Sequence, residues 1–476
     1  MPIPKDVKKN MNDSKNYRAI ALMCAMVKLL DWIILTKFGD KLLSSNLQHG
    51  FSDSTSTGTC TFMFKETVCH YIENNSNVYT AFLDASKAFD RVNTVILFNK
   101  LVNRMLPFPV IRLLYTLYRN QTMCVKWGNC FSDSFGISNG VRQGAIASPV
   151  LFCVYIDDLL KRLEKSHLGC HIGHIYCGAL GYADDIVLLS PQASTLQKML
   201  NICCEFAYEN DIIFKKDKSN FVIFSKNKPT MNPGLFLYTY ENGIVMKSRL
   251  QREDNPIHLG HTLQYNLVDE SDIMKTVNKF IRKANSVISD FKMLYSDHRL
   301  QMIMTYCTSF YGCQLWCKSL GCLRNLYCAY RNVIRKTLRI PSRTHNNLIP
   351  LLTGKLPLQE QINKRVLSFM YKCFHSHNIY VKSVSKMSVQ SPVSYYGSYV
   401  RELLYKYNLF YYVLCCENQL SHIKSAVYKC QGIPHDTDVI ANAGMINELI
   451  DMRDGLTISV LSKDEIVFLL EYLCTA

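Results

Sequence analysis

The sequence predicts an α/β fold in the first half of the chain and a mainly helical region after it. Two apolar segments in the first half have the composition of buried β-strands. One segment ends at Asp84, and the other, residues 180–189, is interrupted by Asp184 and Asp185. In the second half, residues 271–294 place apolar side chains at helical spacing. We therefore expect a sheet of buried strands followed by amphipathic helices.

Length and charge narrow the class of protein. With 476 residues the chain is long enough for two or three domains. Hydrophobic residues make up 48% and charged residues 19%, which indicates a folded chain and excludes a largely disordered one. A net charge of +16 indicates a polyanionic partner, and nucleic acid is favoured over a membrane surface. Charge alone does not distinguish this from a basic soluble protein without such a partner.

The cysteines indicate an intracellular protein. The chain has 20 cysteines, but the residues after Met1 do not form the charged and apolar segments of a secretory signal. We therefore expect an unsecreted protein of the cytoplasm or nucleus whose cysteines stay reduced. The uncharged segment 300–317 is diluted by polar residues, so it predicts a buried helix and not a membrane span.

Two groups of cysteines and histidines were considered as zinc sites. Neither has the pairwise spacing of a standard zinc finger, so buried thiols are the favoured interpretation of both. The two groups are Cys307, Cys313, Cys317, Cys322 and Cys328, and then Cys415, Cys416, His422, Cys430 and His435.

The adjacent carboxylates Asp184 and Asp185 have two interpretations. By itself, an Asp-Asp pair between two strand-like segments is typical of a tight hairpin turn. Their apolar flanks, however, place the pair against a core, where two neighbouring negative charges are costly unless a cation lies between them. Asp84 supplies a third carboxylate from another strand end. Carboxylates so arranged suit two-metal nucleotidyl transfer, in which one ion activates the attacking hydroxyl and the other stabilises the leaving pyrophosphate.

Four segments, in order and spacing, resemble the motifs of reverse transcriptases. Residues 82–90 (FLDASKAFD) resemble motif A, residues 138–149 (SNGVRQGAIASP) motif B and residues 181–190 (GYADDIVLLS) motif C. The leading segments 2–5 and 16–22 resemble the fingers blocks of enzymes from non-LTR (LINE-type) retrotransposons. The chain is therefore similar to the reverse transcriptases of this family.

The resemblance implies a fold, an activity and partners. The fold would be a right-hand polymerase, with fingers and an antiparallel palm sheet in residues 1–265 and a thumb-like helical region in residues 266–345. Residues 346–476 would form a helical region of unknown role. The activity would be RNA-directed DNA polymerase, a nucleotidyltransferase acting on an RNA template, a DNA primer and deoxynucleoside triphosphates. It would use two Mg²⁺ ions, with Mn²⁺ as the alternative ion.

The resemblance also assigns roles to individual residues. Asp84 and Asp184 would be the main metal ligands, supported by Asp185. Phe89 would pack under the sugar and exclude a 2′-hydroxyl, with ordinary core packing as the alternative interpretation. The residues expected to contact the incoming nucleotide or the template are Phe89, Gln143, Gly144, Lys218 and Arg18.

Motif D departs from the family pattern. In residues 210–219 Asp211 stands where the family has glycine and Lys215 where it has asparagine, whereas Lys218 is retained. A non-glycine residue at a turn that needs a positive φ raises the energy of that turn. An alternative expectation is therefore a decayed or co-opted retrotransposon remnant that binds nucleic acid without polymerising. The same alternative is expected if no endonuclease domain, which family members carry before the first fingers block, accompanies this sequence.

Two basic helices are candidates for contacts with nucleic acid. The helix expected at residues 271–294, capped by Ser271 and Asp272, has a basic side on which a thumb would follow the backbone of a duplex. A second helix is expected at residues 325–343. A solvated basic face is the alternative for both. The candidate residues are Lys275, Lys279, Arg282, Lys283, Arg335 and Arg339.

Four further local expectations can be compared with the structure. A helix is expected at residues 17–37 and a loop at residues 379–399. Asp157 and Asp158 lie together in a helix that begins at Ser148, and both are expected to be solvated. The pair Asn242-Gly243 predicts a tight hairpin turn.

Overall fold

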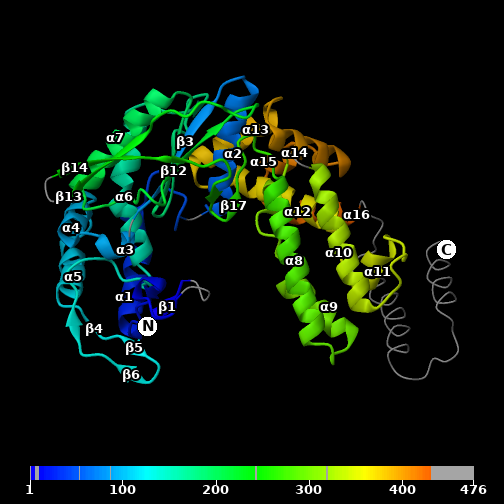
Figure 1. Ribbon diagram of the computed structural model, residues 1–476, viewed down its shortest axis with the longest axis horizontal. Helices are drawn as coiled ribbons and strands as arrows, with labels where there is room; N and C mark the ends of the chain where they lie inside the picture. Colours follow the sequence, from blue (N-terminus) through cyan, green and yellow to red (C-terminus); the bar gives the residue numbers. More distant parts are fainter. Residues whose placement is uncertain are drawn as a thin grey trace. The chain divides into compact units, whose positions relative to one another are not determined.

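The computed structural model describes residues 2–5, 10–52, 54–85, 87–241, 244–317 and 320–429. The chain divides into two compact units (Figure 1). The first contains the residues up to Pro256 together with the segment Ser376–Val384, and the second contains Ile257–His375 and the residues from Ser385 onward. The division into functional regions at residues 265 and 345 stays a prediction, and the boundary between the two compact units lies at Pro256.

A five-stranded sheet forms the centre of the first unit, in the order β10-β11-β3-β12-β15. Its first four strands are antiparallel, as expected, and only the short edge strand β15 runs parallel to its neighbour. In that order, the strands are Ala179–Tyr182, Asp185–Ser190, Val78–Asp84, Asn220–Phe224 and Gln251–Arg252.

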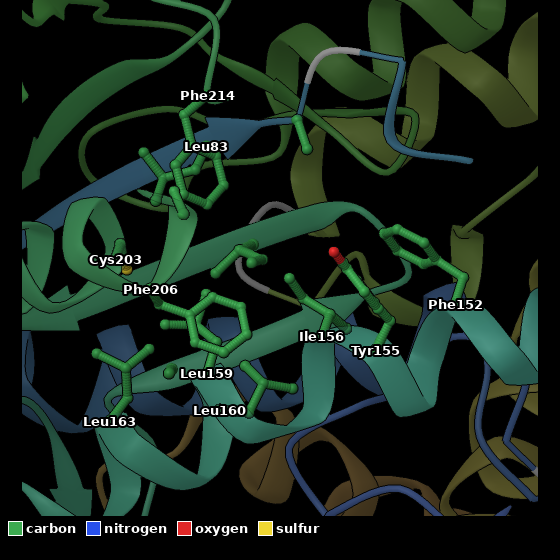
Figure 2. Close-up of a cluster of buried hydrophobic side chains, with 14 of the residues drawn as sticks. Leu83, Phe152, Tyr155, Ile156, Leu159, Leu160, Leu163, Cys203, Phe206 and Phe214 are labelled. Carbon is green, nitrogen blue, oxygen red and sulfur yellow. The ribbon is translucent and has the colours of Figure 1, made fainter. Parts of the chain in front are cut away.

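Both faces of the sheet are covered by helices (Figure 1). On one face Phe82 of β3 meets Phe64 of α2 (Thr57–Glu73), with ring centroids 5.9 Å apart. On the other face Leu83 belongs to a buried cluster with residues of α6 (Ser148–Lys165) and α7 (Ala193–Glu209) (Figure 2). Neighbouring residues of β3 thus point to opposite faces, as the two-residue period of a strand requires.

Helix α6 carries a buried charge that the sequence did not indicate. The side chain of Asp157 is fully buried, and its carboxylate lies 2.6 Å from Arg104 and 2.7 Å from Lys161. It also accepts a hydrogen bond of 2.7 Å from the backbone N–H of Ser45. Asp158 is partly exposed and forms an ion pair with Lys100. The expectation that both carboxylates are solvated is therefore wrong for Asp157, whose partners Arg104 and Ser45 come from distant parts of the chain.

The N-terminal segment begins with strands and not with a helix. Residues Pro2–Pro4 (β1) pair antiparallel with Tyr17–Ala19 (β2). Helix α1 therefore begins only at Ala25 and extends to Phe38, which corrects the expected helix at residues 17–37. The remaining helices of this unit are Gly39–Leu42 (η2), Ala88–Arg91 (α3), Thr94–Asn103 (α4) and Phe108–Arg119 (α5), and Ser14–Asn16 forms a short 3₁₀ helix (η1).

Small hairpins complete the first unit. Strand β13 (Phe236–Glu241) pairs with β14 (Ile244–Arg249) and packs on α7. The expected turn at Asn242-Gly243 lies outside the described residues. The other short strands are Thr122–Met123 (β4), Lys126–Trp127 (β5), Cys130–Phe131 (β6), Phe135–Gly136 (β7), His171–Ile172 (β8) and Ile175–Tyr176 (β9).

The second unit consists mainly of helices. It begins with the hairpin of Ile257–His258 (β16) and His261–Thr262 (β17). Its helices are Glu270–Asp290 (α8), Ser296–Tyr306 (α9), Leu323–Leu338 (α10), Leu348–Thr353 (α11), Leu358–Phe374 (α12), Tyr395–Lys406 (α14), Tyr412–Cys415 (α15) and Leu420–Lys429 (α16), with 3₁₀ turns at Cys313–Leu315 (η3) and Leu320–Cys322 (η4). Helix α13 (Ile379–Gln390) begins in the first unit and ends in the second.

Three expectations about this region are corrected. Residues 379–399 form α13 and the start of α14 in place of a loop. The helix expected at residues 300–317 ends at Tyr306. Helix α8 begins at Glu270, so Ser271 and Asp272 lie inside the helix and are not its cap. The buried Asp272 carboxylate lies 2.9 Å from His261 Nδ1 and accepts a hydrogen bond of 2.9 Å from Trp316 Nε1.

The cysteines in the described part of the chain are all free thiols. Most are buried, but Cys328, Cys415 and Cys416 are exposed, so burial does not hold for every member of the two groups. Cys430 and His435 lie outside the described residues. No helix in the described ranges has the length and apolar character needed to cross a lipid bilayer.

Candidate active site

The two acidic segments meet at one end of the central sheet. Asp84 is the last residue of β3, Asp185 is the first of β11, and they are direct partners in the antiparallel ladder. Asp184 lies in the two-residue turn after β10, in which Ala183 has a φ of 56°. The expectation that Asp84 lies beside the Asp184-Asp185 hairpin is confirmed. The Asp-Asp pair forms the expected tight turn, and its role in binding metal ions stays a prediction that is compatible with this turn.

A loop from an earlier part of the chain holds this turn in place. The buried side chain of Gln48 accepts a hydrogen bond of 2.9 Å from the backbone N–H of Ala183. The same oxygen accepts from Gly50 N at 3.0 Å, and a Cβ at Gly50 would lie 2.5 Å from Ala183 N. Only glycine fits there without a shift of the backbone. The sequence does not indicate the roles of Gln48 and Gly50, because a single amide or glycine carries no signal of a partner more than a hundred residues away.

Burial and mutual repulsion make the charged forms of the turn carboxylates unfavourable. Burial, and then the neighbouring charges of Asp184 and Asp84, raise the pKa of Asp185 to about 6. Burial also raises the pKa of Asp184, whereas the positive charges of Lys218 and Arg18 oppose this rise. A bound cation would therefore offset the repulsion between these carboxylates and stabilise their charged forms.

This charge makes the stability of the metal-free protein depend on pH. The folded-state pKa of Asp185 lies above its ordinary value of 3.8, so its contribution is most favourable below pH 3.8 and is lost as the pH rises through 6. We expect Asp185→Asn to gain on the order of 1 to 3 kcal/mol relative to wild type between pH 4 and pH 7.5. Urea unfolding of both proteins in EDTA measures this, and a difference that does not change with pH would contradict it.

Lys218 contacts the site directly. Its ammonium lies 3.1 Å from the Asp84 carboxylate, and both side chains are partly exposed. The segment that carries Lys218 is also hydrogen-bonded to the backbone of Asp84. Lys215 N donates to Asp84 O at 2.9 Å, and Asp84 N donates to Ser219 Oγ at 3.2 Å. Arg18 is exposed on β2. The structure thus brings two of the expected nucleotide-binding cations into the electrostatic environment of the carboxylates.

The turn of motif D has the conformation that was expected to be strained. Asp211 has a φ of 52°, the left-handed region in which glycine is preferred. The substitution of glycine by aspartate at this position raises the energy of the turn by about 1 kcal/mol. Even so, the segment that follows it still carries Lys218 to Asp84.

The glycines of motif B allow close backbone packing. Gly140 has a φ of 95°, and a Cβ there would lie 2.9 Å from the carbonyl oxygen of Asp90. Gly144 has a φ of 106°, and a Cβ there would lie 3.0 Å from Ala21 O. The expected contact of Gly144 with a nucleotide stays a prediction, and the structure gives both glycines a packing reason. The two glycines let motif B approach motif A and the N-terminal segment.

Gln143 and Phe89 lie along the same stretch. Gln143 Nε2 donates a hydrogen bond of 2.9 Å to Asp90 of motif A, and its backbone carbonyl accepts from Ala21 N at 2.7 Å. The half-buried ring of Phe89 stacks on Phe152 with centroids 4.9 Å apart and an interplanar angle of 16°. The ring thus has a packing partner on one side, which leaves both interpretations of Phe89 open.

The donor set fits a hard cation, but it does not enclose one. Within the described ranges, no three histidine, cysteine or acidic side chains converge closely enough to surround a metal ion. Mg²⁺ commonly binds one or two protein carboxylates and fills its other positions with water and substrate phosphates. Asp84, Asp184 and Asp185 match that pattern in their chemistry and position. The expected three-carboxylate set therefore fits an ion shared with a triphosphate, and not a preformed cage.

The basic residues of the second unit fall into two groups. Four of them are exposed on α8, namely Lys275, Lys279, Arg282 and Lys283. Arg339 is exposed at the end of α10. Arg335 is a correction, because its guanidinium is buried and donates to Thr344 O at 2.8 Å and to Asn346 Oδ1 at 2.7 Å. This arginine holds the segment after α10 and does not present a free charge to a phosphate.

The chain is similar to proteins of transposable elements. The chain is 26% identical over 227 residues to the Pol polyprotein of the type-2 retrotransposable element R2DM of Drosophila melanogaster, covering 48% of this chain and 21% of that protein. It is 22% identical over 320 residues to the probable RNA-directed DNA polymerase from transposon X-element of the same species, covering 63% and 33%. The RNA-directed DNA polymerase from mobile element jockey of Drosophila funebris is 23% identical over 289 residues, covering 56% and 31%. The chain thus spans a third or less of the length of these relatives.

A solved structure and a family model complete the comparison. Telomerase from Candida albicans in complex with a fragment of telomeric RNA matches with a TM-score of 0.35 and 13% identity, covering 91% of this chain and 56% of that one. This likeness is too weak to support a conclusion. Residues 3–263, however, match the model of the reverse transcriptase (RNA-dependent DNA polymerase) family. Because this match covers more than half of the chain, and its motifs form the acidic site described above, the chain belongs to the reverse transcriptase family.

Proposed function

We propose that this chain is the RNA-directed DNA polymerase of a non-LTR retrotransposon. The observation that carries the proposal is the register of β3 and β11, which places Asp84 opposite Asp185 beside the Asp184 turn. An Asp84 carboxylate that already contacts Lys218 adds support, because a polymerase site must hold both cations and the anionic triphosphate. The family's enzymes share this need for divalent metal ions.

The proposed roles follow from position. Asp84, Asp184 and Asp185 would hold two Mg²⁺ ions, or Mn²⁺ in their place. When bound, such ions activate the primer's 3′-hydroxyl and stabilise the charge of the leaving pyrophosphate. Lys218 would contact the phosphates of the deoxynucleoside triphosphate, and Arg18 would lie near the same charge. Gln143 and Gly144 would border the nucleotide and the template base.

Primer extension on an RNA template tests the proposal directly. The protein is incubated with an annealed DNA primer, the four deoxynucleotides and Mg²⁺, and a parallel reaction with a DNA template tests template preference. Extension that depends on the RNA template supports the proposal. Binding to the annealed template without any extension, in Mg²⁺ or in Mn²⁺, would instead favour a co-opted remnant. That alternative rested on the altered motif D, yet Lys218 remains 3.1 Å from Asp84.

Phe89 provides a test of sugar selection. If its ring excludes a 2′-hydroxyl, Phe89→Ala should raise ribonucleotide incorporation relative to deoxynucleotide incorporation by about tenfold or more. Competing single-nucleotide incorporation reactions measure this ratio. Phe89→Tyr, which keeps the ring against Phe152, is the matched control and should retain selection. An equal loss of both reactions in Phe89→Ala would show that the ring serves only core packing.

The exposed cations of α8 provide a test of duplex binding. Replacing Lys275 and Lys279 by alanine should weaken binding to duplexes of every sequence alike, because phosphate contacts carry no sequence information. The slope of log affinity against log salt should fall by about one for each lost contact. Fluorescence anisotropy over a salt series measures this. The control replaces the exposed Lys165 and Lys198 of the first unit. An equal change of the slope in both variants would show that the basic side of α8 is only a solvated face.

A further inference from the structure

The helix end before motif D carries an acidic residue where glycine is ordinarily preferred. Helix α7 ends at Glu209, Asn210 follows as its cap, and Asp211 has a φ of 52°. Ile212 N donates to Ala207 O at 2.9 Å, the bond that closes a helix end with a left-handed residue. Aspartate tolerates this conformation less well than glycine does. We therefore ask what the carboxylate of Asp211 contacts.

The carboxylate of Asp211 has a defined partner. Asn93 Nδ2 donates a hydrogen bond of 2.7 Å to Asp211 Oδ2. The amide oxygen of Asn93 meanwhile accepts from Val95 N at 3.0 Å and from Ile96 N at 3.3 Å, and thereby caps α4. Both ends of the amide are thus engaged, which orients it. Asn93 follows motif A, so this bond joins the end of motif A to the start of motif D.

Tyr155 of α6 completes the link. Its hydroxyl donates to Asn210 O at 2.5 Å and accepts from Asn93 N at 3.3 Å. Packing alone does not support the turn on every side, because a cleft of about 400 Å³ borders it. Asp90, Asp211, Ile212 and Tyr238 are among the residues that line this cleft. Polar bonds therefore hold the turn where side-chain packing is incomplete.

The segment beyond the turn reaches the carboxylate site. Phe214 forms an antiparallel bridge with Ala85, and Lys215 N donates to Asp84 O at 2.9 Å. Lys218 Nζ then lies 3.1 Å from Asp84 Oδ2. Residues 212–217 join the turn to Lys218, and the backbone bonds to Ala85 and Asp84 tie this segment to the end of motif A.

We propose that Asp211 is a positioning residue of the nucleotide site. Its hydrogen bond to Asn93 holds the motif D turn against the end of motif A, so that Lys218 stays directed at the carboxylates. A glycine would relax the backbone at this point but could not form the bond. This role rests on the proposed polymerase function, in which Lys218 contacts the triphosphate and Asp211 acts through it.

An exchange of the two side chains tests the bond. Asn93→Asp keeps a cap on α4, because aspartate and asparagine cap equally well, but it places two carboxylates face to face. The KM for deoxynucleotide should rise about fivefold with kcat nearly unchanged, the effect of losing one hydrogen bond. The double variant Asn93→Asp with Asp211→Asn restores the bond with donor and acceptor exchanged, and should recover the wild-type KM. Asn103→Asp adds the same charge at an exposed position of α4 as a control.

Two substitutions of Asp211 separate the effect of losing its carboxylate from the effect of backbone strain. Asp211→Gly and Asp211→Ala both lack the carboxylate, so both should raise the KM to a similar extent. Both residues keep the left-handed conformation of this position, but only alanine is sterically disfavoured in it, so the alanine variant should have the lower melting temperature. If the KM rose only in the less stable alanine variant and stayed at the wild-type value in Asp211→Gly, the effect would be one of stability alone, and the proposal would be overturned.

Amide hydrogen exchange tests the link without any catalysis. In the absence of nucleotide, the amides of Lys215 and Ser219 should exchange about fivefold faster in Asn93→Asp than in wild type and return to normal in the exchanged pair. Unchanged exchange in Asn93→Asp, or no recovery in the pair, would overturn the proposal. A wild-type protein that extends no primer would instead refute the polymerase function, while the exchange rates would still decide whether Asp211 holds this segment.

Discussion

Asp184→Asn protein should fold like wild type but lose primer extension by about a thousandfold. Asparagine keeps the size of the side chain and its capacity for hydrogen bonds, but it removes one of the charges that balance a divalent ion. Metal ions contribute several kcal/mol of transition-state stabilisation in such sites, which corresponds to this loss of rate. Single-turnover extension on an RNA template measures the rate. Asp133→Asn, at an exposed position outside the site, is the control and should extend normally.

The free energy of unfolding of Asp184→Asn provides an independent test of the same site. Because burial and neighbouring carboxylates disfavour the charged form of Asp184, Asp184→Asn should be as stable as wild type in EDTA, or slightly more stable. Wild type should gain stability when Mg²⁺ and deoxynucleotide are added, since a ligand that binds only the folded state stabilises it. The variant should lose most of that gain while still binding duplex. Extension by Asp184→Asn at the wild-type rate would refute the assignment of this site.

Asp157→Ala should destabilise the first unit by about 3 to 5 kcal/mol, the range measured when one partner of a buried ion pair is removed. The change leaves the mostly buried Arg104 beside Lys161 with no carboxylate between them, and it removes the acceptor of the Ser45 N–H. Urea unfolding monitored by circular dichroism measures the loss.

The next residue in the sequence supplies the control. Asp158→Ala removes a partly exposed carboxylate paired with Lys100, and exposed pairs contribute at most about 1 kcal/mol. Equal losses in the two variants would mean that burial of Asp157 has no energetic consequence, and would contradict the role assigned to it. A large loss restricted to Asp157→Ala would show that one of two adjacent aspartates organises the packing of α6.

The sequence by itself determined the features that depend on short segments. The strand ending at Asp84, the hairpin at Asp184 and Asp185 and the helices α6 and α7 could all be predicted, because local hydrophobic spacing decides whether a segment is strand or helix. The strained motif D turn was predictable from the resemblance, because the family has glycine where this chain has Asp211. Family resemblance supplied the order of these segments and the antiparallel sheet.

Only the tertiary structure decided which polar side chains are buried and what they contact. Asp157 and Asp158 look alike in the sequence, yet only one meets Arg104 and Ser45 in the interior. Gln48 holds the Asp184-Asp185 turn across a separation of 135 residues. Arg335, expected on a basic surface, is buried by the segment after its helix. In each case the free energy of a charge or amide depends on partners that folding brings from elsewhere in the chain, and local sequence does not specify those partners.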